Sequence, residues 1–344
     1  MSSGPLLTPA PADSRRGPTR GQIRRRRAVA LVLLALLAAG AAVVAGVLGG
    51  PGGVPSAATA VDAPPGVTPG PAPQGANGPL ATPLGGGLID LDREGEDVEY
   101  DARRPPKGGV LVDLDSGEVL WQRRATSMRP IASLTKMMTA LVAAERLVAD
   151  DDVKITDEVL AYRGSGVGVL PKGQRVKVEA LLHGLLLPSG NDAARALALR
   201  AAGSQAAFVE RMNQQAERWG LGCTTFASVE GLSSRNRSCP ADLAALGRRV
   251  LDVPRLAAIV AKERAQLPFP IAGGRLFLTN NNPLLREDYR GAIGVKTGYT
   301  RRAGRCLVAA AERGDERLLV VVLDSPDPGR QAEQLLNRGF KALG

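Results

Sequence analysis

The pattern of apolar and polar positions separates an N-terminal part from a body, residues 89–344, in which strand-like and helix-like runs follow one another. Two short apolar-rich runs, 109–113 and 118–122, enclose the turn residues Asp115-Ser116-Gly117 and predict a β-hairpin. Three more strand-like runs, separated by turns, lie near the end of the chain: 291–298, 306–311 and 317–323. Strands are therefore expected at both ends of the body.

The middle of the body has helical spacing instead. Leu134, Met137 and Met138 begin a series of apolar residues three or four positions apart. Asn191 and Asp192 are both good N-caps for a later helix. The predicted helices cover 133–147, 178–187, 191–202, 208–219, 241–253 and 329–343. This order predicts an α+β fold, an α/β sandwich whose sheet comes from both chain ends, is flanked by helices and carries a helical subdomain.

The N-terminal part predicts export. Residues 28–50 have no charged side chain and are long enough to cross ~30 Å of hydrocarbon as a helix, and arginines occupy 24–27. Because arginines mark the cytoplasmic side, we expect a basic cytoplasmic tail at 1–27 and a transmembrane anchor, or uncleaved signal, at 28–50. Two alternatives stay open, namely a buried core helix and a signal peptide cleaved at the A-x-A site Ala58-Thr59-Ala60.

A linker is expected between this segment and the body. Residues 51–88 contain nine Pro and nine Gly among 38 positions, with one charged side chain. Such a composition cannot bury a core. The linker would let the body, residues 89–344, work at some distance from a membrane surface.

Composition and charge exclude several classes of protein. Hydrophobic residues make up 44% of the chain, enough for a sizeable core, and the formal net charge is +10. Aromatic residues make up only 3%, so the stacking platforms of single-strand binders are missing and no nucleic-acid partner is expected. One His, three scattered Cys and no Gly-rich phosphate loop predict neither metal nor cofactor. An enzyme that activates its nucleophile without histidine, or a binding protein, remains.

Three short motifs could carry chemistry: Ser133-Leu134-Thr135-Lys136, Ser189-Gly190-Asn191 and Lys296-Thr297-Gly298. Residues three apart on a helix face the same side, so Lys136 can reach the Ser133 hydroxyl. At a helix start, free backbone amides and the helix dipole stabilise negative charge. A lysine that is partly desolvated and close to a second cation, Lys296, can lose its proton near neutral pH and act as a base.

The second and third motifs offer binding groups. Ser189 and Asn191 are predicted on a turn between two helices, where a hydroxyl and an amide can relay a proton and hold a substrate amide. The third motif is predicted to end a strand. There Gly298 lets an extended substrate lie close to the strand edge, while Lys296 and Thr297 offer a charge and a hydroxyl to a carboxylate.

The flanks of the motifs resemble a known family. Segments 131–140, 186–194 and 294–300, the last followed by 303–307, are similar to the motif regions of the low-molecular-weight penicillin-binding proteins that act as D-alanyl-D-alanine carboxypeptidases. The resemblance covers about residues 98–342 and implies a β-lactamase/transpeptidase-like fold with an antiparallel sheet. One departure is the segment 226–232, which lacks the Asn-Pro pair that usually follows the Phe. Members often have a C-terminal amphipathic anchor, whereas here we expect attachment through the N-terminal helix.

The resemblance implies serine acyl transfer. Ser133 would attack the peptide bond between the terminal D-alanines of a peptidoglycan stem peptide, with Lys136 as general base and Ser189 passing the proton to the leaving amine. Backbone N–H groups of Ser133 and Tyr299 would form the oxyanion hole, and β-lactams would acylate Ser133. The implied substrate-binding residues are Asn191, Lys296, Thr297, Gly298 and Tyr299. The protein would act at the outer face of a bacterial cell membrane, or as a secreted enzyme if the signal is cleaved.

Other functions at the same site stay open. A DD-endopeptidase or transpeptidase would use it on cross-linked peptide, and a β-lactam or muropeptide sensor would be acylated without turnover. A β-lactamase is disfavoured because no Glu-x-x-Leu-Asn segment is evident.

Several residues outside the motifs carry expectations of their own. His183 is expected to pack in the core and Cys306 to be a buried free thiol. Cys223 and Cys239, 16 residues apart in an exported body, can form a disulfide or remain free. The arginines near the third motif would favour an acidic substrate, without one of them being assigned: Arg301, Arg302 and Arg305.

Overall fold

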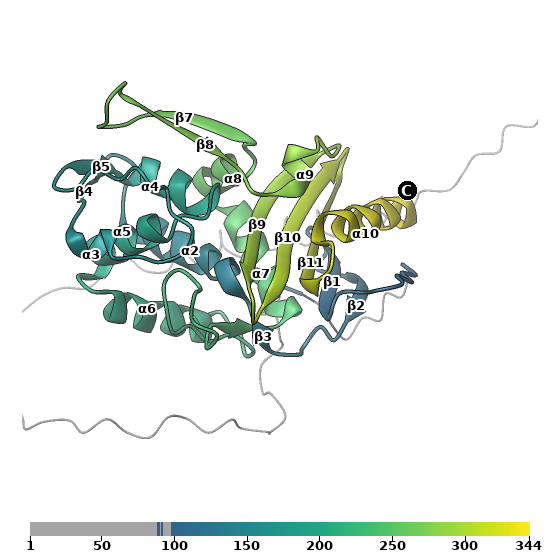
Figure 1. The fold of residues 1–344 in the computed structure, drawn as a ribbon. Coiled ribbons are helices and arrows are strands. Elements are labelled where there is room, and N and C mark those ends of the chain that lie inside the picture. The colour runs from purple at the N-terminus through teal and green to yellow at the C-terminus, as the bar shows by residue number, and fades with distance from the viewer. Residues whose placement is uncertain (1–87, 90, 92–97) are drawn as a thin grey trace, which may run out of the picture. The chain divides into compact units, whose positions relative to one another are not determined.

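The computed structural model describes residues 88–89, 91 and 98–344 (Figure 1). The predicted tail at 1–27, the predicted anchor at 28–50 and all but the last residue of the predicted linker lie outside the described residues. Of the helices that are described, none combines the length and the apolar character needed to span a bilayer.

An antiparallel five-stranded sheet forms the centre of the body, in the order β2-β1-β11-β10-β9. Its strands are β1 (Gly108–Asp113), β2 (Val119–Arg123), β9 (Ala292–Thr300), β10 (Gly304–Arg313) and β11 (Glu316–Ser325). The first and last strands of the chain pair directly, with Leu111 opposite Val320. The prediction of a sheet built from both chain ends is therefore confirmed.

Both faces of this sheet are covered. Along β11, Leu319 and Val321 belong to the core on the helical side, while Leu318 and Val320 belong to the core on the other side. Helix α7 (Pro240–Asp252) packs on the first face and α10 (Pro328–Leu343) on the second, as Figure 1 shows. Glycines allow the close approach, because an added Cβ at Gly247 or Gly339 would lie 2.7 Å from a leucine of β11.

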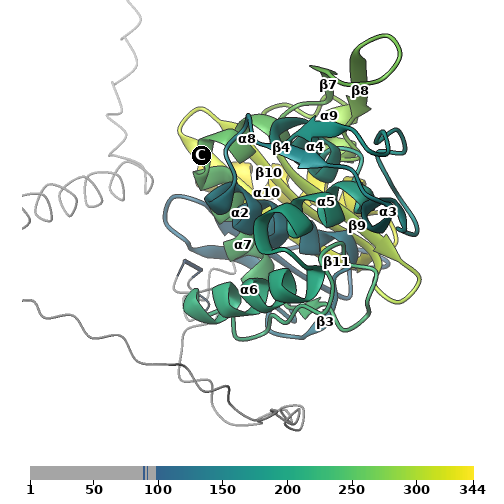
Figure 2. The same cartoon turned by 90° about the vertical axis from the view of Figure 1, so that its left-hand side faces the viewer.

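Most of the remaining helices form a region on one side of the sheet, which Figure 2 views face on. They are α2 (Lys136–Arg146), α3 (Asp157–Leu160), α4 (Val178–Leu186), α5 (Asn191–Ala202), α6 (Gln205–Arg218) and α8 (Pro254–Val260). The short α9 (Pro283–Arg286) lies by β9 instead, and its Leu284 belongs to the same core as α10. Eight of the nine residues of α4 are buried, so α4 lies within this region. The predicted helical subdomain is confirmed.

Three two-stranded ribbons were not predicted: β3 (Arg129–Pro130) with β6 (Arg237–Ser238), β4 (Asp152–Lys154) with β5 (Arg175–Lys177), and β7 (Arg264–Pro268) with β8 (Arg275–Thr279). The first two have strands of two or three residues, too short for a periodic pattern. The third projects from the helical region in Figure 1 and buries only one face, with Leu276 and Leu278 inward and Phe277 exposed.

Two of the predicted element ends that are wrong lie at the motifs. The third motif does not end its strand, because the ladder between β9 and β10 continues until Thr300 pairs with Gly304. The helix predicted from 133 begins instead with a 3-10 turn, η2 (Ala132–Thr135), and the α-helix follows from Lys136. Thr135 stabilises the tight turn by donating its hydroxyl to Ala132 O at 2.8 Å.

The N-cap prediction for α5 is also wrong. The N-cap is Gly190, which has no side chain to offer, and Asn191 and Asp192 are the first helical residues. Their side chains are engaged elsewhere. The carboxylate of Asp192 accepts hydrogen bonds from the amides of Val167 and Gly168 at 2.8 and 3.0 Å, which holds the preceding loop against α5.

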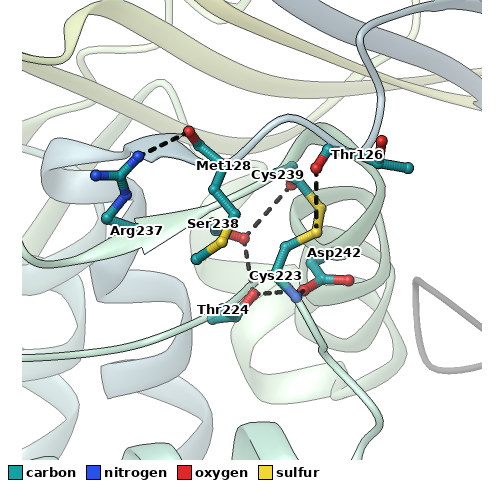
Figure 3. The surroundings of a disulfide bond; sticks show 8 residues. All are labelled: Thr126, Met128, Cys223, Thr224, Arg237, Ser238, Cys239 and Asp242. Atoms are coloured by element: carbon teal, nitrogen blue, oxygen red, sulfur yellow. Dashed lines mark hydrogen bonds between the residues drawn. A yellow bond between two sulfur atoms is a disulfide. The ribbon is translucent and has the colours of Figure 1, made fainter. Parts of the chain in front are cut away.

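The open question of the cysteines is settled by a disulfide between Cys223 and Cys239 (Figure 3). It joins the segment after α6 to the start of α7. Asp242 supports the junction, because its carboxylate accepts from Cys223 N at 2.8 Å and from the Thr224 hydroxyl at 2.7 Å. Cys306 is a buried free thiol, as predicted, and burial raises its pKa to about 11.

His183 is packed in the core, as predicted, with 1% of its surface exposed. Its Nδ1 lies 2.9 Å from Glu179 O, and its Nε2 lies 3.3 Å from Lys262 Nζ. Burial lowers the pKa of His183 below its ordinary value of 6.5, so the ring is neutral at pH 7.

Candidate active site

Ser133 and Lys136 meet at the junction between η2 and α2. Lys136 is fully buried, and its Nζ lies 2.9 Å from Ser133 Oγ, the contact that the spacing of the motif predicts. Two more oxygens surround Nζ, Asn191 Oδ1 at 2.7 Å and Glu230 O at 2.7 Å. One comes from α5 and the other from the segment after α6, so three parts of the chain converge on this amine.

This arrangement suits a neutral amine. A neutral lysine has two N–H donors and one lone pair, and Asn191 Oδ1 and Glu230 O can each take one N–H. The lone pair then faces Ser133 Oγ and can accept its proton. Burial lowers the pKa of Lys136 well below its ordinary value of 10.5, and the nearby charge of Lys296 lowers it further. Lys136 can therefore act as a base.

Ser189 occupies the turn between α4 and α5. It has a φ of 69°, a left-handed conformation that is costly for a residue with a Cβ. Its hydroxyl oxygen is shielded and has no hydrogen-bond partner among the described residues, although it lines the same cleft as Ser133. A strained backbone and an unpaired hydroxyl leave Ser189 available for a bound substrate.

Asn191 has less freedom. Its Oδ1 accepts from Lys136, and its Nδ2 donates to Arg163 O at 2.6 Å. The amide thus fixes Lys136 and the loop around residue 163 in one position. The substrate-binding role that the sequence predicts for Asn191 stays a prediction.

The third motif lies on β9, the edge strand that faces the helical region in Figure 1. An added Cβ at Gly298 would lie 3.0 Å from Ile131 O and 3.1 Å from Ser133 N. Glycine therefore brings the strand backbone against the nucleophile turn, next to one of the amides expected in the oxyanion hole. The role of the Tyr299 amide stays a prediction. Tyr299 itself is 65% exposed and lines the cleft described below.

The side chain of Lys296, a residue of β9, is buried. Its Nζ donates to Thr297 O at 3.0 Å, and burial lowers its pKa to about 7. A lysine with that pKa is partly charged at neutral pH. It can therefore contribute positive potential both to a bound carboxylate and to Lys136.

A cleft of about 570 Å³ opens at this site, and the buried Lys136, Asn191 and Lys296 lie behind its lining residues. Of the predicted site residues, Ser133, Ser189, Thr297, Gly298 and Tyr299 line it directly. The sequence did not predict several further lining residues: Ser165, Asn281, Pro283, Arg286, Glu287, Asp327, Pro328 and Gly329. These residues come from loops and helix ends, and no periodic pattern marks them.

Arg305 is the one of the three unassigned arginines that lines this cleft. It lies on β10 opposite Tyr299 on β9, and its guanidinium donates to Pro326 O at 3.1 Å. An acidic group in the cleft would meet this arginine and Arg286.

No side-chain cluster among the described residues offers a complete metal site. The group of Cys223, Cys239 and Asp242 has its candidate ligand atoms within 4.8 Å of one another, but the disulfide occupies both sulfurs. The contact between Ser133 and Lys136 beside the cleft would suit a serine nucleophile with a lysine base.

Comparison with known proteins agrees with this geometry. Residues 101–327 match the sequence profile of the peptidase S11 family, the D-alanyl-D-alanine carboxypeptidases. The chain belongs to this family. It is 39% identical over 248 residues to the D-alanyl-D-alanine carboxypeptidase DacC of Escherichia coli, which covers 67% of this chain and 60% of that relative. It is 36% identical over 245 residues to DacB2 of Mycobacterium tuberculosis, with 69% and 82% covered.

Solved structures of family members have the same fold. The Streptomyces K15 DD-transpeptidase aligns with a TM-score of 0.66 at 32% identity, over 71% of this chain and 100% of its own. The D-alanyl-D-alanine carboxypeptidase of Mycobacterium tuberculosis aligns with a TM-score of 0.66 at 34% identity, over 71% and 94%. The expected β-lactamase/transpeptidase-like fold is confirmed. The match nevertheless spans only about 60% of the length of the Escherichia coli relative.

Proposed function

We propose that this protein is a serine D-Ala-D-Ala carboxypeptidase that removes the terminal D-alanine from peptidoglycan stem peptides through an acyl-enzyme on Ser133. The observation that carries the proposal is the buried Lys136 amine, 2.9 Å from Ser133 Oγ with two other oxygens on its N–H groups. Membership of the family and the names of its relatives support the same substrate class.

Acylation would begin with Ser133 Oγ attacking the carbonyl carbon of the last peptide bond. The Oγ–C bond forms while the Oγ–H bond breaks, and Lys136 Nζ takes the proton. The developing oxyanion would be held by the amides of Ser133 and Tyr299, each worth about 3 kcal/mol in such sites. The Ser189 hydroxyl, which has no other described partner, would give its proton to the leaving amine as the C–N bond breaks and would take up the proton held by Lys136. Free D-alanine would depart and Lys136 would be neutral again.

Deacylation would return the enzyme to its starting state. A water molecule would add to the ester carbonyl and give one proton to Lys136, which would return it to Ser133 Oγ as the ester bond breaks. Substrate and β-lactams both carry a carboxylate, which Thr297 and Arg305 in the cleft would hold, with the buried Lys296 adding positive charge. β-Lactams would thus acylate Ser133 as covalent inhibitors.

The decisive test is release of D-alanine from a pentapeptide ending in D-Ala-D-Ala. The full chain is compared with Ser133→Ala and with Ser127→Ala, a half-buried serine outside the cleft. Release by wild type and Ser127→Ala, together with loss in Ser133→Ala, is the expected result. Absence of release despite stoichiometric penicillin labelling of Ser133 would refute hydrolysis of free peptide and favour a sensor. Transfer of the acyl group to an added D-amino acid, in preference to water, would favour the transpeptidase named among the structural relatives.

We also propose that residues 28–50 anchor the protein in the cell membrane with the body outside. The uncharged stretch and the preceding arginines support this orientation. Expressed at full length in a bacterial host, the protein should sediment with membranes and resist extraction by carbonate. An N-terminus found near Ala60 in the culture medium would contradict the anchor and establish secretion after cleavage.

A further inference from the structure

The segment 226–232, which departs from the family pattern in sequence, runs directly beside the nucleophile and its base. Glu230 O accepts from Lys136 Nζ at 2.7 Å, and Val229 O accepts from the Thr139 hydroxyl at 2.6 Å. Gly231 has a φ of 94°, and an added Cβ there would lie only 2.0 Å from Ala132 O. The backbone of this segment is therefore locked against η2 and α2.

A buried asparagine holds the same segment from its other side. Asn236 Nδ2 donates to Ser228 O at 2.8 Å and to Thr135 Oγ1 at 2.9 Å, and its Oδ1 accepts from Ala227 N at 2.9 Å. These bonds tie the segment to the nucleophile turn. The Glu230 side chain is thus attached to a fixed backbone next to Lys136.

The Glu230 carboxylate has no donor of its own. Its Oε2 is shielded from solvent and accepts no hydrogen bond from the described residues. The other carboxylate that acts on Lys136 is that of Asp192, which accepts from Val167 N, Gly168 N and Ala193 N at 2.8 to 3.0 Å. A shielded carboxylate oxygen without donors is costly unless a positive charge lies near it. Lys136 is a cation whose charged form this carboxylate favours.

We propose that Glu230 is a positioning residue for the proton transfer, supplying the counter-charge that stabilises Lys136 once Lys136 holds the proton taken from Ser133. This inference rests on the acyl-transfer function proposed above. The atoms balance without Glu230 reacting, because the proton moves from Ser133 Oγ to Lys136 Nζ and the carboxylate exchanges none. Its role is purely electrostatic.

The charges around Lys136 set the direction of the effect. Burial and Lys296 on β9 lower the pKa of Lys136, while Glu230 and Asp192 raise it. Loss of the Glu230 charge should therefore lower this pKa further, by on the order of one unit. The acid limb of the pH profile of acylation should move to lower pH by the same amount. The plateau rate of acylation should fall about threefold, because Lys136 becomes a weaker base.

The test compares Glu230→Gln, which removes the charge, with Glu230→Asp, which keeps it. Glu145→Gln on the exposed face of α2 is the matched control, because it removes one charge from the same helix away from the cleft. Glu230→Ala is the alternative should the Gln variant not fold. The pKa of Lys136 is read from the titration of its 13Cε signal in lysine-labelled protein, which needs no substrate. The pH profile of Ser133 acylation is read with a fluorescent penicillin.

In Glu230→Gln, the pKa of Lys136 and the acid limb of the acylation profile are both expected to shift downward. In Glu230→Asp and Glu145→Gln, both should change by less than 0.3 pH units, roughly the size that surface charges produce. A folded Glu230→Gln protein with an unchanged Lys136 titration and acid limb would overturn the inference. The Lys136 titration could shift as expected although neither the wild type nor any variant releases D-alanine. In that case the inference about Glu230 stands and the proposed carboxypeptidase function fails.

Discussion

Replacing Gly298 with alanine should slow acylation and lower stability together. The added Cβ would lie 3.0 Å from Ile131 O, 3.1 Å from Ser133 N and 3.2 Å from Leu134 N. All three atoms belong to the backbone of the nucleophile turn, so none can rotate away as a side chain would. Strand β9 and the turn must separate by a few tenths of an ångström, which costs about 1–3 kcal/mol in a packed structure.

The same displacement moves the Ser133 amide relative to the strand that is expected to supply the second oxyanion donor. A misplacement near 1 Å costs on the order of 100-fold in rate, so a few tenths should slow acylation about tenfold. The assay is the second-order rate of labelling by a fluorescent penicillin, with thermal unfolding measured in parallel. Gly108→Ala on β1 is the control, since the nearest atom there is a side-chain carbon of Pro240 at 3.3 Å. A Gly298→Ala protein that acylates within twofold of the wild type would refute the reasoning.

Three further predictions follow from the described residues. The charge of Lys296 is lost as the pH rises through its pKa of about 7, so the rate of acylation by benzylpenicillin should fall about tenfold on the alkaline side. The uncharged methyl ester of benzylpenicillin should show no such fall in the same stopped-flow assay. Burial holds the pKa of His183 below 6.5, so just below that pH the unfolded chain binds more protons than the folded one. The free energy of unfolding should therefore fall as the pH drops below 6.5. His183→Gln should flatten this dependence of stability on pH in urea titrations from pH 7.5 to 5. Replacing Cys223 and Cys239 together with serine opens a loop of 16 residues and should lower the free energy of unfolding by about 3 kcal/mol in urea, whereas an unchanged midpoint would show that the cross-link adds nothing.

Local sequence explains the parts of the fold and site that were predicted correctly. Ser133 and Lys136 are three residues apart, so a single helical turn brings their side chains together whatever surrounds them. The strands near the C-terminus follow each other through short turns, and their apolar residues are dense enough to identify them. The prediction failed where geometry departs from the regular pattern, as at η2, a tight 3-10 turn whose first residue, Ala132, has a φ of 48°.

Long-range packing decides the rest of the site. Lys136 obtains its two other oxygen partners from residues 55 and 94 positions away, and neither Asn191 nor Glu230 signals this partnership in the sequence. Arg305 enters the cleft, unlike its neighbours Arg301 and Arg302, because the pairing of β10 with β9 sets it opposite Tyr299.

The sequence by itself determined which residue types are available and which lie within one turn of each other: the serine and lysine pair, the glycine of the third motif and the apolar series of the sheet and helices. Only the tertiary structure decided the burial that lowers the pKa of Lys136, the unpaired Ser189 hydroxyl and the shielded carboxylate oxygen of Glu230. The physical reason is that pKa and hydrogen bonding depend on burial and on charges brought together through space. Those distances exist only once the sheet from both chain ends has closed against the helices.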